Sequence, residues 1–222
     1  MVYGHGIYVR EETTSLITPI EGTAGLQVII GTAPVNLAAD PYRCTNKPML
    51  CYSFKEASEN VGYSDDFAKY TLCQSVDACF RVFNVAPIIL INVLDPEKHK
   101  KEIPESSCIV ERGMAKLAET GVLLDTVTVK TADGTDLEAD VDYILSFEDS
   151  GEVIVTLLDV YLDGTELKVS ATAIDPEAVT YADVIGGTDI NTGTETGMEV
   201  LIAMSGRNIL LFAEQEDAFC WV

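Results

Sequence analysis

The chain has 222 residues, of which 36 are acidic and 14 are basic, so its formal net charge is -22. Such a surface repels phosphate backbones and anionic lipid headgroups, which argues against a nucleic-acid-binding or membrane-surface protein. Hydrophobic residues make up 47% of the chain, enough to build a sizeable core. The longest apolar stretch, Val85–Leu94, is interrupted by Pro87 and Asn92 and is shorter than the roughly 18–20 residues of a membrane span.

Cysteine and histidine usage argues against a metal site, and the N-terminal sequence argues against export. The six cysteines include no Cys-x-x-Cys pair, and the chain has only two histidines. Structural zinc sites need closely spaced ligand pairs, so we predict none. The N-terminus has no basic stretch leading into an apolar segment, so we expect no signal peptide and synthesis in the cytoplasm. Free, buried thiols are then the expected state of the cysteines.

The first predicted element is an extended arm over residues 1–24. Ile7, Tyr8 and Val9 form a short β-prone run, and Pro19 follows a Thr/Ser-rich stretch that does not favour a helix. Such an arm cannot bury its apolar side chains by itself. We therefore expect Ile7, Tyr8 and Val9 to pair with a sheet edge, either in the same chain or in a neighbouring copy.

Residues 25–103 are predicted to be the first part of an α/β core. Apolar runs bounded by glycine or proline predict strands, and apolar positions at three-to-four spacing predict helices. Ser53, with Glu56 three residues later, forms a capping box at a helix start. The predicted strands are Gly25–Thr32, Met49–Tyr52 and Pro87–Leu94, and the predicted helices are Phe54–Asn60 and Asp66–Phe83. The second helix carries an aromatic stripe that we expect in the core: Phe67, Tyr70, Phe80 and Phe83.

The composition changes after Pro96, where the charged segment Glu97–Glu102 predicts an exposed linker that includes His99. Residues 104–176 then alternate short β-prone runs with Xaa-Gly turns, which predicts an inserted antiparallel β-sandwich or barrel domain. Alternation of apolar and polar residues within the runs implies one buried face. The predicted strands are Cys108–Val110, Met114–Leu117, Thr126–Lys130, Asp142–Phe147, Glu152–Leu158 and Glu166–Ala173.

Residues 177–222 are predicted to return the chain to the core. A Thr/Gly-rich loop contains Gly186 and Gly187, and we expect a helix to begin near Thr194 and to run through Met198. The glycines match neither the P-loop nor the dinucleotide-binding pattern, so we interpret the loop as a turn leading into a helix. For residues 208–222 we predict a further strand or helix.

The chain has few candidates for catalytic or ligand-binding residues. His5 lies between two glycines in the arm, and the sequence places no partner beside it. The carboxylates of Asp133–Asp142 lack the order of an EF-hand loop. We therefore predict no catalytic, cofactor-binding or metal-binding residues, and we interpret the chain as an assembly protein that is not an enzyme and needs no cofactor.

Several blocks of the sequence, in order, resemble the tail sheath proteins of contractile phages, prophages and phage-tail-like bacteriocins. The first is HGIYVREETTSLITPIEGTAGLQVIIGTAPVN at His5–Asn36, and the second is YSFKEASENVGYSDDFAKYTLCQSVDACF at Tyr52–Phe80. VDYILSFEDSGEVIVTLLD at Val141–Asp159 is similar to the inserted β domain of that family, and YADVIGGTDINTGTETGMEVL at Tyr181–Leu201 is similar to the return into its core. After Leu201 the likeness ends, so we expect the N-terminal portion of a sheath subunit with a truncated, atypical C-terminus.

The resemblance implies a structural subunit that stacks as hexameric rings around a tail tube and contracts to drive the tube through the host envelope. The implied partners are further copies of the chain, the tube protein and baseplate proteins, without nucleic acid or membrane. The implied location is the virion tail, after assembly in the host cytoplasm. In that family, arms of neighbouring subunits complete a shared sheet, which implies the same role for Ile7, Tyr8 and Val9.

Two other functions are compared with this one. A β-sandwich surface or carbohydrate-binding module of a phage particle predicts exposed aromatic residues in the β region, where the candidates are Tyr143, Phe147 and Tyr161. An α/β hydrolase or a nucleotide-dependent enzyme predicts a nucleophile or phosphate motif, and neither is present in the sequence.

Overall fold

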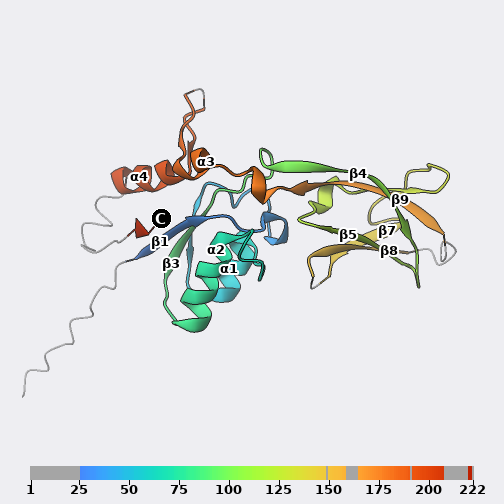
Figure 1. Cartoon of the computed structure of the whole chain (residues 1–222), viewed down its shortest axis with the longest axis horizontal. Coiled ribbons are helices and arrows are strands. Elements are labelled where there is room, and N and C mark those ends of the chain that lie inside the picture. The colour runs from blue at the N-terminus through green and yellow to red at the C-terminus, as the bar shows by residue number, and fades with distance from the viewer. Residues whose placement is uncertain (1–25, 149, 159–164, 191, 208–219, 222) are drawn as a thin grey trace, which may run out of the picture.

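The computed structural model describes residues 26–148, 150–158, 165–190, 192–207 and 220–221. These residues form a mixed α/β structure with two lobes that lie end to end, an α/β lobe and a lobe made of strands (Figure 1). The predicted arm, residues 1–24 with Ile7, Tyr8 and Val9, lies outside the described residues. Of the helices that the structure describes, none combines the length and apolar character that crossing a bilayer requires.

A four-stranded sheet with the order β12-β1-β3-β2 forms the centre of the α/β lobe. Strands β1 and β3 run parallel, and β2 runs antiparallel to β3. All five residues of β3 are buried, which explains its continuous apolar run. The strands are β1 Gln27–Gly31, β2 Pro48–Cys51, β3 Ile88–Asn92 and β12 Cys220–Trp221, so the three predicted strands of this region are confirmed with shifted ends.

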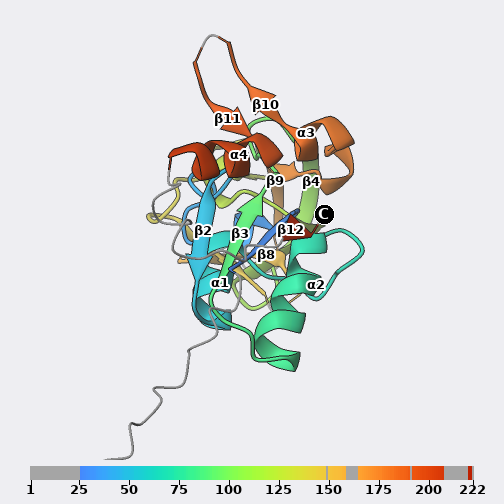
Figure 2. The same cartoon turned by 90° about the vertical axis from the view of Figure 1, so that its left-hand side faces the viewer.

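Helices cover both faces of this sheet. Helices α1 (Phe54–Val61) and α2 (Thr71–Asp77) pack on the face that carries Ile29 and Leu90. Helix α4 (Met198–Arg207) lies on the other face, where Val200 packs among apolar residues of β1 and β3. Figure 2 shows the sheet between these two helix layers. The alternation of faces along β1 and β3 follows from the two-residue period of a strand.

Helix α1 begins where the capping signal predicts. The Ser53 hydroxyl accepts the Glu56 amide at 3.2 Å, while the Glu56 carboxylate accepts the amide of Tyr52 at 2.9 Å. The helix ends at Gly62, whose φ is +80°. A Cβ at Gly62 would lie 2.0 Å from the Pro34 carbonyl oxygen, so only glycine fits this close approach.

The prediction of one helix over Asp66–Phe83 is wrong at both ends. Helix α2 begins only at Thr71, because the Thr32 hydroxyl and carbonyl oxygens accept the amides of Thr71 and Leu72 at 3.1 and 2.9 Å. After Asp77 the chain continues as a π-helical turn, η2 (Ala78–Val82), in which the Phe83 amide donates to the Ala78 carbonyl. The wider turn carries Phe83 away from the buried stripe.

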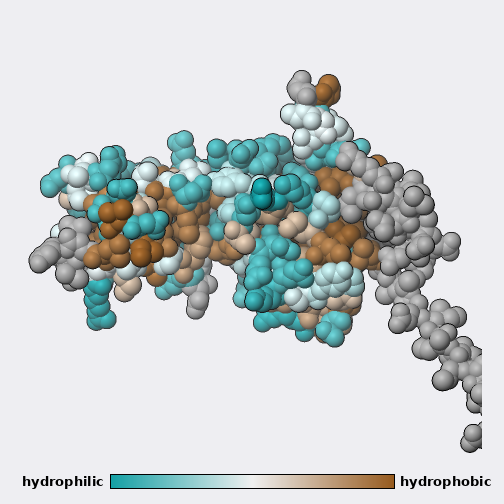
Figure 3. All heavy atoms as spheres, turned by 180° about the vertical axis from the view of Figure 1, so that it is seen from behind, coloured by the Kyte–Doolittle hydropathy of each residue, from teal (hydrophilic) through white to brown (hydrophobic). Residues whose placement is uncertain are grey.

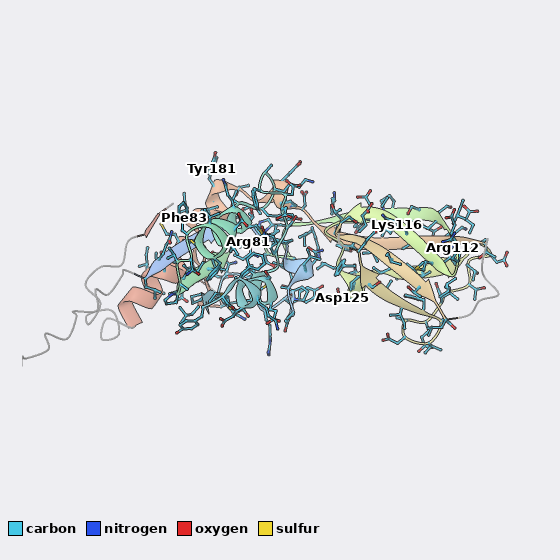
Figure 4. All side chains as sticks on the ribbon, turned by 90° about the horizontal axis from the view of Figure 1, so that it is seen from below. Arg81, Phe83, Arg112, Lys116, Asp125 and Tyr181 are labelled. Atoms are coloured by element: carbon cyan, nitrogen blue, oxygen red, sulfur yellow. The ribbon has the colours of Figure 1, made fainter. Side chains whose placement is uncertain are left out.

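The aromatic stripe is therefore only partly in the core. Tyr70 is buried, and Phe67 and Phe80 are half-buried against the core. Phe83 is 72% exposed, so its predicted burial is wrong, and Figure 4 shows it at the surface of the α/β lobe.

The second lobe contains two three-stranded antiparallel sheets with the orders β4-β9-β6 and β5-β8-β7. Their inward-facing side chains, among them Val129, Val155 and Leu167, form one buried cluster. The described strands do not close into a barrel. The strands are β4 Lys100–Ile109, β5 Met114–Thr120, β6 Thr128–Thr131, β7 Tyr143–Phe147, β8 Glu152–Leu157 and β9 Glu166–Ile174, with the short helix η3 at Leu124–Thr126.

Seen from behind, the β lobe exposes hydrophobic surface (Figure 3). Its exposed apolar residues include Ile109, Met114, Val141 and Ile144.

The charged segment Glu97–Glu102 is predicted to be an exposed linker. Lys100, Lys101 and Glu102 are exposed, but they lie in a strand, so the prediction of a linker is wrong for this half. Lys100, Lys101 and Glu102 begin strand β4, where they pair with the end of β9. Strand β4 is at the edge of its sheet. Charged residues and a proline on an edge strand oppose unwanted pairing with other chains, which explains this composition within a strand.

In the return segment, the prediction that a helix begins near Thr194 is wrong. Glu195 and Thr196 form strand β11, which pairs with β10 at Gly187–Thr188, so helix α4 begins only at Met198. The hairpin projects from the α/β lobe between α3 (Tyr181–Ile185) and α4 (Figure 1). Of residues 208–222, only β12 is described. Two further short helices are η1 at Val35–Leu37 and η5 at Pro176–Ala178.

Candidate functional site

The outer edge of strand β1 lies in a groove with a volume of about 630 Å³. Strand β1 supplies Ile29 and Ile30, helix α2 supplies Thr71 and Gln74, and the segment around α3 supplies the remaining wall. Figure 1 shows β1 with α2 below it and α3 above it. Segments far apart in the sequence therefore meet along one strand edge.

In the described part of the chain, this outer edge pairs with strand β12 alone. Strand β12 pairs only with Val28 and Ile29. The Gly31 carbonyl accepts the Val93 amide at 2.9 Å, so Gly31 bonds toward β3. Because neighbouring residues of a strand direct their backbone groups to opposite sides, Ile30 directs its groups away from β3, to the side on which β12 pairs with Val28 and Ile29. Beyond Ile29, no strand of the described part of the chain pairs with this edge.

The end of β1 fits closely against the start of α2. A Cβ at Gly31 would lie 2.7 Å from the Thr71 hydroxyl and 3.2 Å from the Leu72 amide nitrogen, so the glycine permits this approach. The Thr71 hydroxyl in turn accepts the Thr32 amide at 3.2 Å. These contacts fix one end of the groove in a defined position relative to the open edge.

The lining of the groove suits a peptide strand. Ile29, Ile30 and Val179 offer apolar surface, and Tyr181 at one wall is 90% exposed (Figure 4). Lys69 also lines the groove, and its ammonium is already 3.0 Å from the Asp66 carboxylate. A peptide that adds to the edge of a sheet as an extra strand gains affinity from main-chain hydrogen bonds, and its alternate side chains fill apolar pockets beside that edge.

A second cluster of polar side chains lies at the root of the β lobe. Asp183 is 8% exposed, and its carboxylate accepts the Thr180 amide at 2.8 Å, the Thr180 hydroxyl at 2.7 Å and the Lys98 ammonium. His99 Nε2 lies 3.4 Å from the same carboxylate. A cavity of about 400 Å³ adjoins this cluster.

Opposing effects act on the ionisation of Asp183. Burial of the carboxyl group raises its pKa, but hydrogen bonds from Lys98 and Thr180 and the nearby His99 outweigh this effect. The pKa of Asp183 therefore lies well below its usual range, and the group is a carboxylate at neutral pH.

The predicted exposure of His99 is wrong, because the ring is 3% exposed. Its Nδ1 accepts the Asp95 amide at 3.0 Å, and its own amide donates to the Asp95 carbonyl at 2.7 Å. This turn draws the ring inward although its neighbours in the sequence are charged. The aspartate four residues before His99 is the sequence signal that could have indicated the turn.

The other residues considered from the sequence do not form a reactive site in the described structure. Gly186 and Gly187 lie at the base of the β10–β11 hairpin, and the described residues contain no His/Cys/Asp/Glu group arranged for a metal ion. The predicted free, buried state is confirmed for five of the six cysteines, Cys44, Cys51, Cys73, Cys79 and Cys108. Burial raises the pKa of Cys44 and Cys73 to about 11, so neither is a thiolate at neutral pH. His5 lies outside the described residues.

The two described aromatic residues of the β lobe do not form an exposed binding face. Tyr143 is buried and Phe147 is half-buried against the core of the lobe. Tyr161 lies outside the described residues. Carbohydrate-binding surfaces need exposed aromatic rings, so these positions do not favour a carbohydrate-binding module.

Comparison with known proteins finds no match. The chain matches no family model, no curated protein and no solved structure. The resemblance to tail sheath proteins stays a prediction from the sequence.

Proposed function

We propose that the chain is a structural subunit of a contractile phage-type tail sheath. In this proposal, copies of the chain join when a strand from one copy adds to the β1 edge of another. The observation that carries the proposal is the outer edge of β1, which pairs with β12 over only two residues in the described part of the chain and lies in a largely apolar groove. An unpaired strand edge is a template for another chain, and proteins that do not use such an edge cover or charge it.

The incoming strand is the β-prone run Ile7, Tyr8 and Val9 of the N-terminal arm. Its backbone would pair along the outer edge of β1 in place of the two-residue strand β12, and its alternate side chains would enter the apolar groove. The stretch between Val9 and Leu26 spans up to about 55 Å when extended, which is long enough to reach a neighbouring copy. The arm therefore links subunits and lets their other interfaces slide.

The β lobe is proposed to be an inserted β-sandwich domain on the outer surface of the sheath. Its two sheets share one buried cluster, as a sandwich requires. The chain enters this lobe at Lys100 and leaves it at Ile174, and these residues are paired with each other. Adjacent entry and exit points are typical of an insertion that leaves the host domain intact.

In this reading the subunits form stacked hexameric rings around a tube protein and contact a baseplate, in the tail of a virion assembled in the bacterial cytoplasm. Contraction is a rigid-body rearrangement between an extended, metastable state and a shorter, stable one. The free energy is stored during assembly, so the subunit acts without a cofactor and without an enzymatic step.

In the test, residues 1–20 are deleted from the full-length subunit, and this variant is coexpressed with its tube protein. Electron microscopy then shows whether sheaths form. We expect sheaths to be lost, because the linking strand is absent. As a control, alanine at Ile109 and Ile144, which are exposed on the β lobe and do not line the groove, should leave polymerisation intact. Sheaths that form normally without residues 1–20 would reject the proposal.

A further inference from the structure

The outer edge of β1 is occupied by a short strand of the same chain. Strand β12 runs parallel to β1, with Cys220 opposite Val28 and Trp221 opposite Ile29, and Figure 1 shows it beside β1 near the C-terminal end. The proposed function assigns this same edge to a strand from a second copy. Because one set of backbone groups cannot bond to two strands at once, β12 and the incoming strand compete.

The register shows which backbone groups β12 uses. In a parallel ladder, one residue of each opposed pair bonds to the two residues that flank its partner. Ile29, like Gly31, directs its backbone groups toward β3, so Trp221 supplies the bonds of the pair that these two residues form. The amide and the carbonyl of Trp221 therefore face Val28 and Ile30, the two residues of β1 that direct their groups outward.

Strand β12 is a much shorter partner of β1 than β3 is. Strand β3 pairs with five residues of β1, whereas β12 pairs with two. Parallel pairing is also slightly less stable per residue than antiparallel pairing. An incoming strand can continue past the end of β12 into the groove, which is lined there by Ile30 and Thr32. The incoming strand therefore gains a longer ladder than the strand that it replaces.

The covalent link to α4 favours β12 while the chain is alone. Residues 208–219 connect β12 to α4, and α4 is packed on the sheet through Val200. A segment tethered in this way acts at an effective concentration on the order of millimolar. A strand from a second copy acts only at the concentration of the free chain. Pairing with β12 therefore dominates in dilute solution and gives way where copies are concentrated.

A two-residue outer strand also protects the sheet from wrong partners. A long, unpaired strand edge is a template for unspecific pairing with other chains, and very short edge strands are one way in which proteins avoid this. With β12 in place, the outermost strand of this side of the sheet has two residues. A short partner of this kind covers the edge and remains replaceable.

We propose that β12 is an autoinhibitory cap on the assembly edge of β1. This inference rests on the proposed function, because it concerns the edge to which the arm of another copy adds. In the single chain, β12 covers the outward groups of Val28 and Ile30. The incoming strand first contacts the groove beyond Ile29 and then replaces β12, so copies join only where their local concentration is high.

The first test compares two substitutions at one position of the whole chain. Trp221→Pro removes the backbone donor that faces β1, whereas Trp221→Ala removes the same ring and keeps the donor, which makes it the matched control. Sedimentation velocity over a range of concentrations measures association between copies. We expect Trp221→Pro to associate at least threefold more tightly than Trp221→Ala, because its β12 competes less well for the edge.

The second test uses the unchanged chain and hydrogen exchange at low and high concentration. Exchange of the Trp221 amide should become at least threefold faster as copies associate, since the incoming strand displaces β12. The Val93 amide, which bonds to the other side of β1 through the Gly31 carbonyl, is the internal reference and should keep its rate.

The outcomes separate the cap from the proposed function. The cap is overturned, and the proposed function stands, if the chains associate but the two variants do so equally and the Trp221 amide keeps its exchange rate. If neither the unchanged chain nor either variant associates at any concentration, the proposed function is overturned and the cap with it.

Discussion

Replacing Asn92 by leucine should lower the free energy of unfolding by about 4 kcal/mol, because it leaves buried backbone groups without partners. Asn92 is fully buried at the end of the central strand β3. Its Oδ1 accepts the amides of Ala33 and Leu94 at 3.1 and 3.0 Å, and its Nδ2 donates to the Ala33 carbonyl at 3.1 Å. Leucine has a similar size but can make none of these bonds.

Urea unfolding followed by circular dichroism measures this effect. As a control, the exposed Lys55→Leu on α1 should change stability by less than about 0.5 kcal/mol. A loss below about 1 kcal/mol for Asn92→Leu would show that the loop after β1 does not depend on this side chain. That loop leads directly from the open edge of β1, so Asn92 also supports the proposed assembly site.

Replacing Gln74 by tryptophan should weaken association between copies at least tenfold, or about 1.4 kcal/mol. Gln74 is exposed on α2 and lines the groove beside β1. A large ring there occupies the space that an incoming strand needs, while the buried face of α2 is untouched. Sedimentation velocity over a range of concentrations measures the association.

Lys55→Trp is the matched control for this substitution. It places the same ring on α1, where the Lys55 side chain is 84% exposed and does not line the groove. We expect this control to associate like the unchanged chain. Equal weakening by both substitutions would indicate a general effect of the added ring and would remove the support for docking in the groove.

Local signals in the sequence predicted most elements of the fold. The apolar run of β3, the Ser53 cap and the Xaa-Gly turns of the β lobe each indicate a structure that neighbouring residues determine. Most of the wrong predictions lie where contacts between residues far apart in the sequence determine the structure. Thr32 bonds to Thr71, 39 residues later, which sets the start of α2. The exception is His99, because the turn that draws it inward is local and involves Asp95.

The candidate sites were harder to predict for the same reason. The groove joins β1, α2 and the segment around α3, and no local pattern indicates that these meet. The Asp183 cluster likewise joins two segments 85 residues apart. The sequence did predict that a β-prone arm needs a sheet edge, and the structure contains an open edge in the described part of the chain.

The central claim is that the arm of one copy adds as a strand to the β1 edge of another. The most direct measurement titrates a fluorescent peptide of residues 1–20 against the chain that lacks those residues and follows fluorescence anisotropy. We predict saturable binding that is weakened at least tenfold by Tyr8→Pro in the peptide, since proline removes a backbone donor. An anisotropy that stays flat at every concentration, together with an intact chain that remains monomeric, would contradict the account.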